Sequence, residues 1–183
     1  MNIGLFFGTF NPIHNGHIHI SKEVLNSKRV DKIWLIVSPQ NLFKKSSIIL
    51  DKNIRINMIN NAVKKLKNIY SSSVEFKLEK PNYTVNTLNF LSSNYSANNF
   101  KIIIGEDNLA SFDTWKDNDF IKKKYELIVY PRKKKEISKG LFNGELIKIS
   151  STDIREKIKN KESIKHLVPR NVEKEILENA YYS

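Results

Sequence analysis

The sequence predicts an α/β fold, namely a doubly wound parallel sheet with helices on both faces and a helical C-terminal segment. Short apolar runs rich in β-branched and aromatic residues recur along the chain, and several are hydrophobic almost without interruption, as strands covered on both faces are. Stretches with a 3.6-residue apolar period separate them. Over residues 1–130 this alternation is typical of parallel strands joined by right-handed helical crossovers.

Six apolar runs are the expected strands. They are IGLFF at 3–7, KIWLIVS at 32–38, VEFKL at 74–78, KIIIG at 101–105, YELIVY at 125–130 and ELIKIS at 145–150. Each is bounded by polar or turn-forming residues, as strands usually are.

The clearest expected helix runs from Asp51 to Tyr70. Its apolar residues form one stripe beneath a polar face, and they are Ile54, Met58, Ile59, Ala62, Val63, Leu66 and Ile69. Shorter helices are expected at about 17–25 and 84–91. A last helix follows Pro169, whose ring suits a first helical turn. Its apolar positions are Val172, Ile176, Leu177 and Ala180.

Length and composition narrow the class of protein. With 183 residues we expect a single domain, in which 1–148 form the sheet core and 149–183 carry a second motif and the C-terminal helices. The chain has no cysteine, which excludes disulfides, cysteine zinc sites and thiol nucleophiles. The N-terminal stretch has neither a basic region with a cleavage site nor the length of a membrane span, so we expect a cytoplasmic protein that does not engage a membrane.

The chain is strongly basic, with a formal net charge of +12 from 31 Lys and Arg against 19 Asp and Glu. This charge suits an anionic partner such as a nucleotide or a nucleic acid. The lysines are spread over nearly every segment instead of gathering on one face, which favours a solvated surface over a nucleic-acid footprint. We therefore expect no nucleic-acid partner.

In open parallel α/β sheets, ligands bind at the carboxyl ends of the strands. The segments expected there are 8–17, 39–45, 105–115, 131–135 and 150–155. Every distinctive motif of the sequence lies in one of them.

The first motif is GTFNPIHNGH at 8–17. Gly8 lets the backbone turn sharply and approach a ligand. His14 and His17 flank Gly16 at the expected start of a helix, where exposed amides bind phosphate and two imidazoles can donate to one oxyanion. The motif therefore predicts a phosphate clamp. The alternatives are a metal site, which lacks a glutamate at helical spacing, and a surface histidine cluster.

The second motif is ISSTDIR at 149–155. Its hydroxyls and amides, with the planar fork of Arg155, suit phosphate oxygens. Alone, the stretch is also an ordinary helix cap. Paired with the first motif at the same edge of the sheet, it predicts the other half of a nucleotide site.

These motifs carry a resemblance to a known family. GTFNPIHNGH resembles the first signature of the nucleotidylyltransferase superfamily, whose HxGH is shared with class I aminoacyl-tRNA synthetases, and ISSTDIR resembles its second. The stretches at 37–45, 82–88 and 102–115 and the tail from Ile164 resemble bacterial nicotinate-mononucleotide adenylyltransferases. The resemblance covers nearly the whole chain and implies a Rossmann-like fold.

The resemblance implies a set of ATP-binding residues along the edge of the sheet. They are Gly8, Thr9, Phe10, His14, His17, Gly105, Asp107, Ser150, Ser151, Thr152 and Arg155. Among them, His14, His17 and Arg155 are the implied catalytic residues at the phosphates, and Gly105 with Asp107 would hold the nucleotide ribose.

For the mononucleotide, the resemblance implies three further residues. Lys44 would meet the phosphate, Thr84 would lie near the nicotinate carboxylate and Trp115 would stack on the nicotinate ring. Arg55 matches a family arginine and is given no role beyond support of the site.

The implied reaction joins ATP and nicotinate mononucleotide into nicotinate adenine dinucleotide and pyrophosphate, in NAD biosynthesis. Mg²⁺ would be bound with the ATP phosphates, and no protein metal ligands are expected. The alternatives are a phosphopantetheine adenylyltransferase, a cytidylyltransferase, a basic RNA-binding module without turnover and a relic of a tRNA synthetase. The sequence leaves open whether the enzyme prefers nicotinate or nicotinamide mononucleotide. It also leaves open the oligomeric state, and a homo-oligomer is one of the alternatives.

Three positions depart from the family pattern. Many members have glycine at the position of Phe7, aspartate at that of Asn11 and proline at that of Leu42. None of these changes removes an implied phosphate ligand. The basic run at 132–135 either adds charge near the triphosphate or is a solvated loop.

Overall fold

The computed structural model describes residues 1–40, 49–131 and 148–183. Within these ranges five strands form one sheet in the order β3-β2-β1-β4-β5, and every neighbouring pair is parallel. The strands are β1 (Asn2–Gly8), β2 (Lys32–Val37), β3 (Ile69–Ser72), β4 (Asn99–Gly105) and β5 (Glu126–Tyr130). The predicted doubly wound parallel sheet is therefore confirmed.

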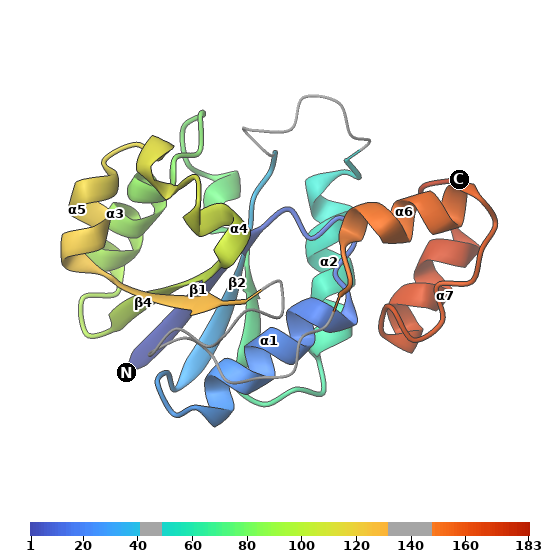
Figure 1. Ribbon diagram of the computed structural model, residues 1–183, viewed down its shortest axis with the longest axis horizontal. Coiled ribbons are helices and arrows are strands. Elements are labelled where there is room, and N and C mark those ends of the chain that lie inside the picture. The colour runs from blue at the N-terminus through green and yellow to red at the C-terminus, as the bar shows by residue number, and fades with distance from the viewer. Residues whose placement is uncertain (41–48, 132–147) are drawn as a thin grey trace.

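Helices cover both faces of this sheet (Figure 1). The α-helices are α1 (Asn15–Asn26), α2 (Lys52–Val63), α3 (Thr84–Asn94), α4 (Glu106–Leu109), α5 (Asn118–Lys124), α6 (Ser151–Lys159) and α7 (Arg170–Glu178), with 3₁₀ turns η1 (Val74–Phe76) and η2 (Phe112–Thr114). Apolar residues of α1, α2, α6 and α7 share one core cluster, and those of α3 and α5 share the other. The helical C-terminal segment, predicted from the sequence, lies beside α2.

The central strands are hydrophobic throughout because they contribute to both cores. In β1, Ile3 and Leu5 pack under α3 and α5, whereas Phe6 points to the opposite cluster. In β4, Ile102 packs in the same cluster as Ile3 and Leu5, and Ile103 packs in the same cluster as Phe6. Successive side chains of a strand face opposite sides of the sheet, so a strand with two covered faces needs no polar alternation.

The segment 64–78 differs from the expectation. The predicted strand at 74–78 is the 3₁₀ turn η1, and the predicted long helix ends at Val63. Asn68 has a φ of 63°, a left-handed conformation that turns the chain back, and its carbonyl accepts from the Ile33 amide at 2.8 Å. The next residues, from Ile69, therefore form β3 beside β2. A tertiary pairing here overrides the helical period of the sequence.

The expected sixth strand is only partly within the described residues. Residues 145–147 lie outside them, and residues 148–150 lead into α6 without joining the sheet. Leu177, expected on the apolar stripe of the last helix, is exposed, whereas Val172 and Ile176 are buried. None of the helices in the described ranges has the length and apolar character to cross a membrane.

Candidate active site

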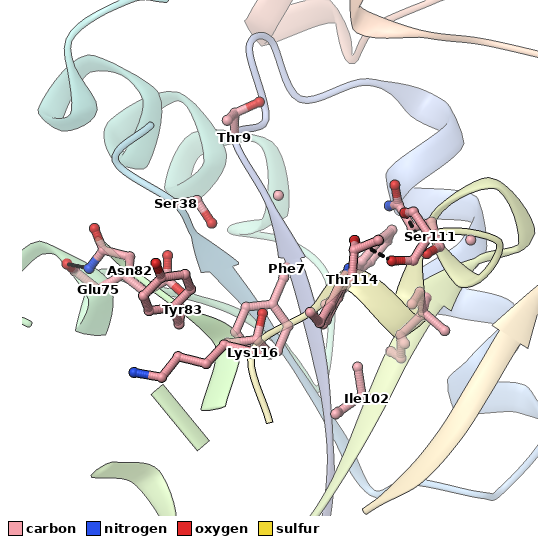
Figure 2. Close-up of a pocket in the computed structure, with 18 of the residues that line it drawn as sticks. Phe7, Thr9, Ser38, Glu75, Asn82, Tyr83, Ile102, Ser111, Thr114 and Lys116 are labelled. Atoms are coloured by element: carbon pink, nitrogen blue, oxygen red, sulfur yellow. Dashed lines mark hydrogen bonds between the residues drawn. The ribbon is translucent and has the colours of Figure 1, made fainter. Parts of the chain in front are cut away.

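A cavity of about 440 Å³ opens where the strand order reverses between β1 and β4. In a doubly wound sheet this is the position at which ligands bind. Five of the residues implied at the substrates line it, and they are Gly8, Thr9, Thr84, Gly105 and Trp115. Figure 2 shows the labelled Thr9 and Ser38, which follow β1 and β2, together above Tyr83 and Lys116.

The turn after β1 is shaped by Phe10. Its φ is 46°, and its buried ring meets Phe6 and His17 edge to face, with ring centroids 5.9 and 4.9 Å away. A Cβ on Gly8 would lie 3.1 Å from this ring, so a larger residue there would require the ring to shift by a few tenths of an ångström. The side chain of Phe10 thus belongs to the core, and only its backbone is available to a nucleotide.

His14 and His17 cap α1 reciprocally. The His17 amide donates to His14 Nδ1 at 3.4 Å, the His14 amide donates to His17 Nδ1 at 3.3 Å, and the two rings stack with centroids 3.6 Å apart. A Cβ on Gly16 would lie 3.0 Å from the His14 ring, which explains the glycine between them. Because each Nδ1 accepts, a neutral ring in this cap carries its proton on Nε2 and presents an Nε2–H donor.

The second motif forms the start of α6 and contacts the first motif directly. The Ser150 hydroxyl accepts from the Asp153 amide at 3.1 Å, as the helix-cap interpretation predicts. The Ser151 hydroxyl donates to the Pro12 carbonyl at 2.9 Å, and Arg155 Nη1 donates to the Asn11 carbonyl at 2.8 Å. The structure therefore brings the two motifs together, although 139 and 144 residues separate these contacts.

Asn11 joins the first motif to two further segments. Its buried Oδ1 accepts from the Leu50 amide at 3.1 Å and from the Tyr182 hydroxyl at 2.9 Å. Burial raises the pKa of Tyr182 despite the opposing charges of Arg155 and Arg55, so the phenol stays a donor. The side-chain oxygen of Asn11 is thus a hydrogen-bond acceptor that holds these segments together, a role that the sequence motif did not reveal.

The other side of the cavity is aromatic, with Tyr83 before α3 and Trp115 after η2. Trp115 is half-buried against Phe112, with ring centroids 5.1 Å apart, and Lys116 Nζ lies 4.9 Å from the centroid of the Tyr83 ring. Thr84 is the first residue of α3, and among the described residues no side chain caps this helix start. First-turn amides without a cap favour an anionic group.

Sequence reasoning missed a buried carboxyl in the cavity wall. Glu75 is only 2% exposed, its Oε1 accepts from the Thr87 hydroxyl at 2.9 Å, and its carbonyl accepts from Asn82 Nδ2 at 2.9 Å. Within the described residues no donor reaches Glu75 Oε2 or Asn82 Oδ1. Burial raises the pKa of Glu75 to about 6, against the opposing effects of the Thr87 and Ser38 hydroxyls. Its only sequence signal was its place in the polar-apolar run that was assigned to a strand.

The remaining implied residues lie at the end of β4 or outside the described ranges. Gly105 ends β4, and a Cβ there would lie 3.0 Å from the Tyr130 hydroxyl and collide with the Asp107 carboxylate. Asp107, in the short helix α4 that follows Gly105, is exposed. Lys44, Leu42 and the basic run at 132–135 lie outside the described residues.

A doubly wound parallel sheet with a cavity at its switch point is typical of the nucleotide-binding α/β class. Comparison with known proteins places the chain within this class. Residues 5–157 match the family described as Cytidylyltransferase-like. The chain belongs to this family, and within it to the nicotinate-nucleotide adenylyltransferases, which makes it a nucleotidyltransferase enzyme.

Two relatives illustrate this membership, and one solved structure shares the fold. Probable nicotinate-nucleotide adenylyltransferases of Cytophaga hutchinsonii and Flavobacterium psychrophilum are 42% and 39% identical, over 100% of this chain and 99% of each relative. Plasmodium falciparum nicotinic acid mononucleotide adenylyltransferase, solved in complex with NaAD, superposes with a TM-score of 0.80 at 17% identity. That alignment covers 99% of this chain and 97% of the other, and it shows a shared fold.

Proposed function

We propose that the protein transfers the adenylyl group of ATP to nicotinate mononucleotide, giving nicotinate adenine dinucleotide and pyrophosphate. The observation that carries this proposal is the direct contact between the two motifs beside a cavity that Trp115 and Thr84 line. The names of the relatives support the same reaction. No feature of the described residues favours phosphopantetheine as the acceptor.

The ATP phosphates lie, in this proposal, between the two motifs. His14 and His17 direct Nε2–H donors to the α-phosphate, and these donors stabilise the negative charge on its oxygens. Arg155 Nη1 donates to the Asn11 carbonyl at 2.8 Å, and Nη2 donates to the Thr152 hydroxyl at 3.3 Å. A guanidinium has five N–H donors in all. The remaining donors, with the Ser151 and Thr152 amides, bind the leaving pyrophosphate, because the Asp153 amide already donates to Ser150.

The rest of the implied ATP set lies along the same edge. The backbone at Gly8, Thr9 and Phe10 lines the nucleotide, and Gly105 with Asp107 holds its ribose. Mg²⁺ bound with the ATP phosphates would supply charge neutralisation there.

The mononucleotide occupies the aromatic side of the cavity. Trp115 stacks on the nicotinate ring, because a flat π-system gains contact at small entropic cost. The nicotinate carboxylate lies at the uncapped start of α3, near Thr84. Lys44, from the segment outside the described residues, is the proposed partner of its phosphate.

The reaction needs alignment more than it needs a base. An oxygen of the mononucleotide phosphate, already anionic, attacks the α-phosphorus of ATP in line, and the bond from that phosphorus to the pyrophosphate oxygen breaks. The new phosphoanhydride joins the two nucleotides, and pyrophosphate leaves with the bonding electron pair. Catalysis then comes from positioning and from charge stabilisation at the phosphates.

An acceptor comparison tests this function. Purified protein with ATP and Mg²⁺ receives nicotinate mononucleotide, nicotinamide mononucleotide or phosphopantetheine in separate reactions, and pyrophosphate release is measured. We expect the highest kcat/KM with nicotinate mononucleotide and formation of the dinucleotide in equal amount to pyrophosphate. Preferred turnover of phosphopantetheine, or no turnover of either mononucleotide, would overturn the proposal.

A further inference from the structure

The side chain of Arg55, in α2, is completely buried, and its hydrogen bonds to the described residues all go to the main chain. Nε donates to the Leu50 carbonyl at 2.9 Å, and Nη2 donates to the Pro39 carbonyl at 2.9 Å. Nη1 donates to two carbonyls, those of Thr9 at 2.6 Å and Ser38 at 2.9 Å. One guanidinium thus satisfies four backbone acceptors.

These acceptors belong to three segments that meet at the cavity. Thr9 follows β1 in the first motif, Ser38 and Pro39 follow β2, and Leu50 precedes α2. Thr9 and Ser38 line the cavity itself, and Figure 2 shows them near each other. The planar fork of Arg55 therefore fixes the relative position of two cavity walls, with a geometry that a lysine ammonium cannot reproduce.

Packing alone does not explain a cation at this position. All four acceptors are neutral carbonyls, and burial lowers the pKa of Arg55, while Tyr182 and Asp51 act in the opposite direction. A buried charge costs more free energy than an apolar side chain of similar size would. The neighbouring buried residues of α2, Met58 and Ile59, fill the core with apolar groups.

We propose that Arg55 is a positioning residue for adenylyl transfer, which holds the Thr9 and Ser38 walls at the separation that aligns the two substrates. This inference rests on the proposed function. The Thr9 segment belongs to the motif that holds ATP, and the Ser38 segment lines the same cavity that receives the mononucleotide, so a shift of one segment against the other acts on the in-line geometry. A displacement of about 1 Å in a reacting pair costs up to about 100-fold in rate.

The test compares Arg55→Met, Arg55→Lys and a matched core variant, Ile59→Ala. Ile59 is equally buried on the same helix and belongs to the apolar core. Thermal melts by circular dichroism set an assay temperature at which all variants are folded, and kcat and both KM values are then measured with ATP and nicotinate mononucleotide.

We expect Ile59→Ala to lose stability while its kcat stays within about twofold of the wild type. Arg55→Met should lose about tenfold or more in kcat, and Arg55→Lys should fall between them because it keeps the charge without the fork. If Arg55→Met does not fold, Arg55→Lys decides, with a loss of at least about threefold in kcat expected.

Two results separate this proposal from the proposed function. A kcat for the Arg55 variants equal to that of Ile59→Ala at matched stability would reduce Arg55 to a structural residue and overturn the inference. Inactive wild-type protein would instead overturn the proposed function.

Discussion

At the scale of single residues, the burial of the Glu75 carboxyl beside the cavity costs the folded protein free energy. Its carboxyl is buried under the start of α3, with the Thr87 hydroxyl as a partner of Oε1 and no partner of Oε2 among the residues described. Burial disfavours the charged form, which is why the pKa rises to about 6. Charged groups held at such a cost are common in functional sites.

Replacing Glu75 by Gln should stabilise the protein at neutral pH and not at acidic pH. The folded protein binds the Glu75 proton more tightly than the unfolded chain does, so this group lowers the free energy of unfolding as pH rises from about 4.5 to above 6. The shift corresponds to about 2 kcal/mol at pH 7, and the Gln amide oxygen still accepts from Thr87.

Urea unfolding of the wild type and Glu75→Gln at pH 4.5 and pH 7 measures this difference. Glu79→Gln, an exposed position nearby, controls for the loss of one charge. A difference between Glu75→Gln and wild type that is the same at both pH values would show that the Glu75 carboxyl is not held as described.

At the scale of elements, α6 depends on its first residues for both stability and contact. Ser150 caps the helix through Asp153, whereas Ser151 and Arg155 bind the main chain of the first motif. Adjacent residues of one motif therefore have separable roles.

Ser150→Ala should lower the free energy of unfolding by about 1 kcal/mol, the usual effect of losing a helix cap. Ser150→Asp should retain most of the stability, because its carboxylate can accept from the same amide. Equilibrium unfolding of both variants checks this expectation. Equal stability of Ser150→Ala and wild type would mean that the cap contributes nothing to α6.

The strands show which elements the sequence pattern predicts and which one it misses. Continuous apolar runs located β1, β2, β4 and β5, because strands buried on both faces have a distinctive composition. The short β3 was missed, since the IYSS run is half polar and follows a helical period that ends only through the left-handed Asn68. Local pattern carries no information on a strand that exists through its pairing with β2.

The same limit applies to the site. His14, His17, Gly16 and Arg155 stand in compact motifs, so their neighbourhood could be predicted from spacing. Arg55 and Tyr182 serve the first motif through contacts over 46 and 171 residues of chain, and no local pattern encodes such partners. Glu75 was read as part of a strand, and its burial follows only from the turn that forms there.

At the scale of the whole molecule, the fold assembles one site from distant segments. The sheet places the first motif at its switch point, and α6 and α7 return the C-terminal segment to that motif through Arg155 and Tyr182 (Figure 1). The paired imidazoles at the start of α1 are the centre of this arrangement, and adenylyl transfer at this site requires that they act at the phosphates.

Turnover by His17→Ala is the most direct measurement of that claim. The backbone amide at position 17 still donates to His14 Nδ1, so α1 keeps one half of its cap, whereas the imidazole Nε2–H donor is lost. We predict that kcat with ATP and nicotinate mononucleotide falls about 100-fold or more, at a temperature at which a thermal melt shows the variant to be folded. Turnover near the wild-type rate in folded His17→Ala would contradict this role of the imidazole.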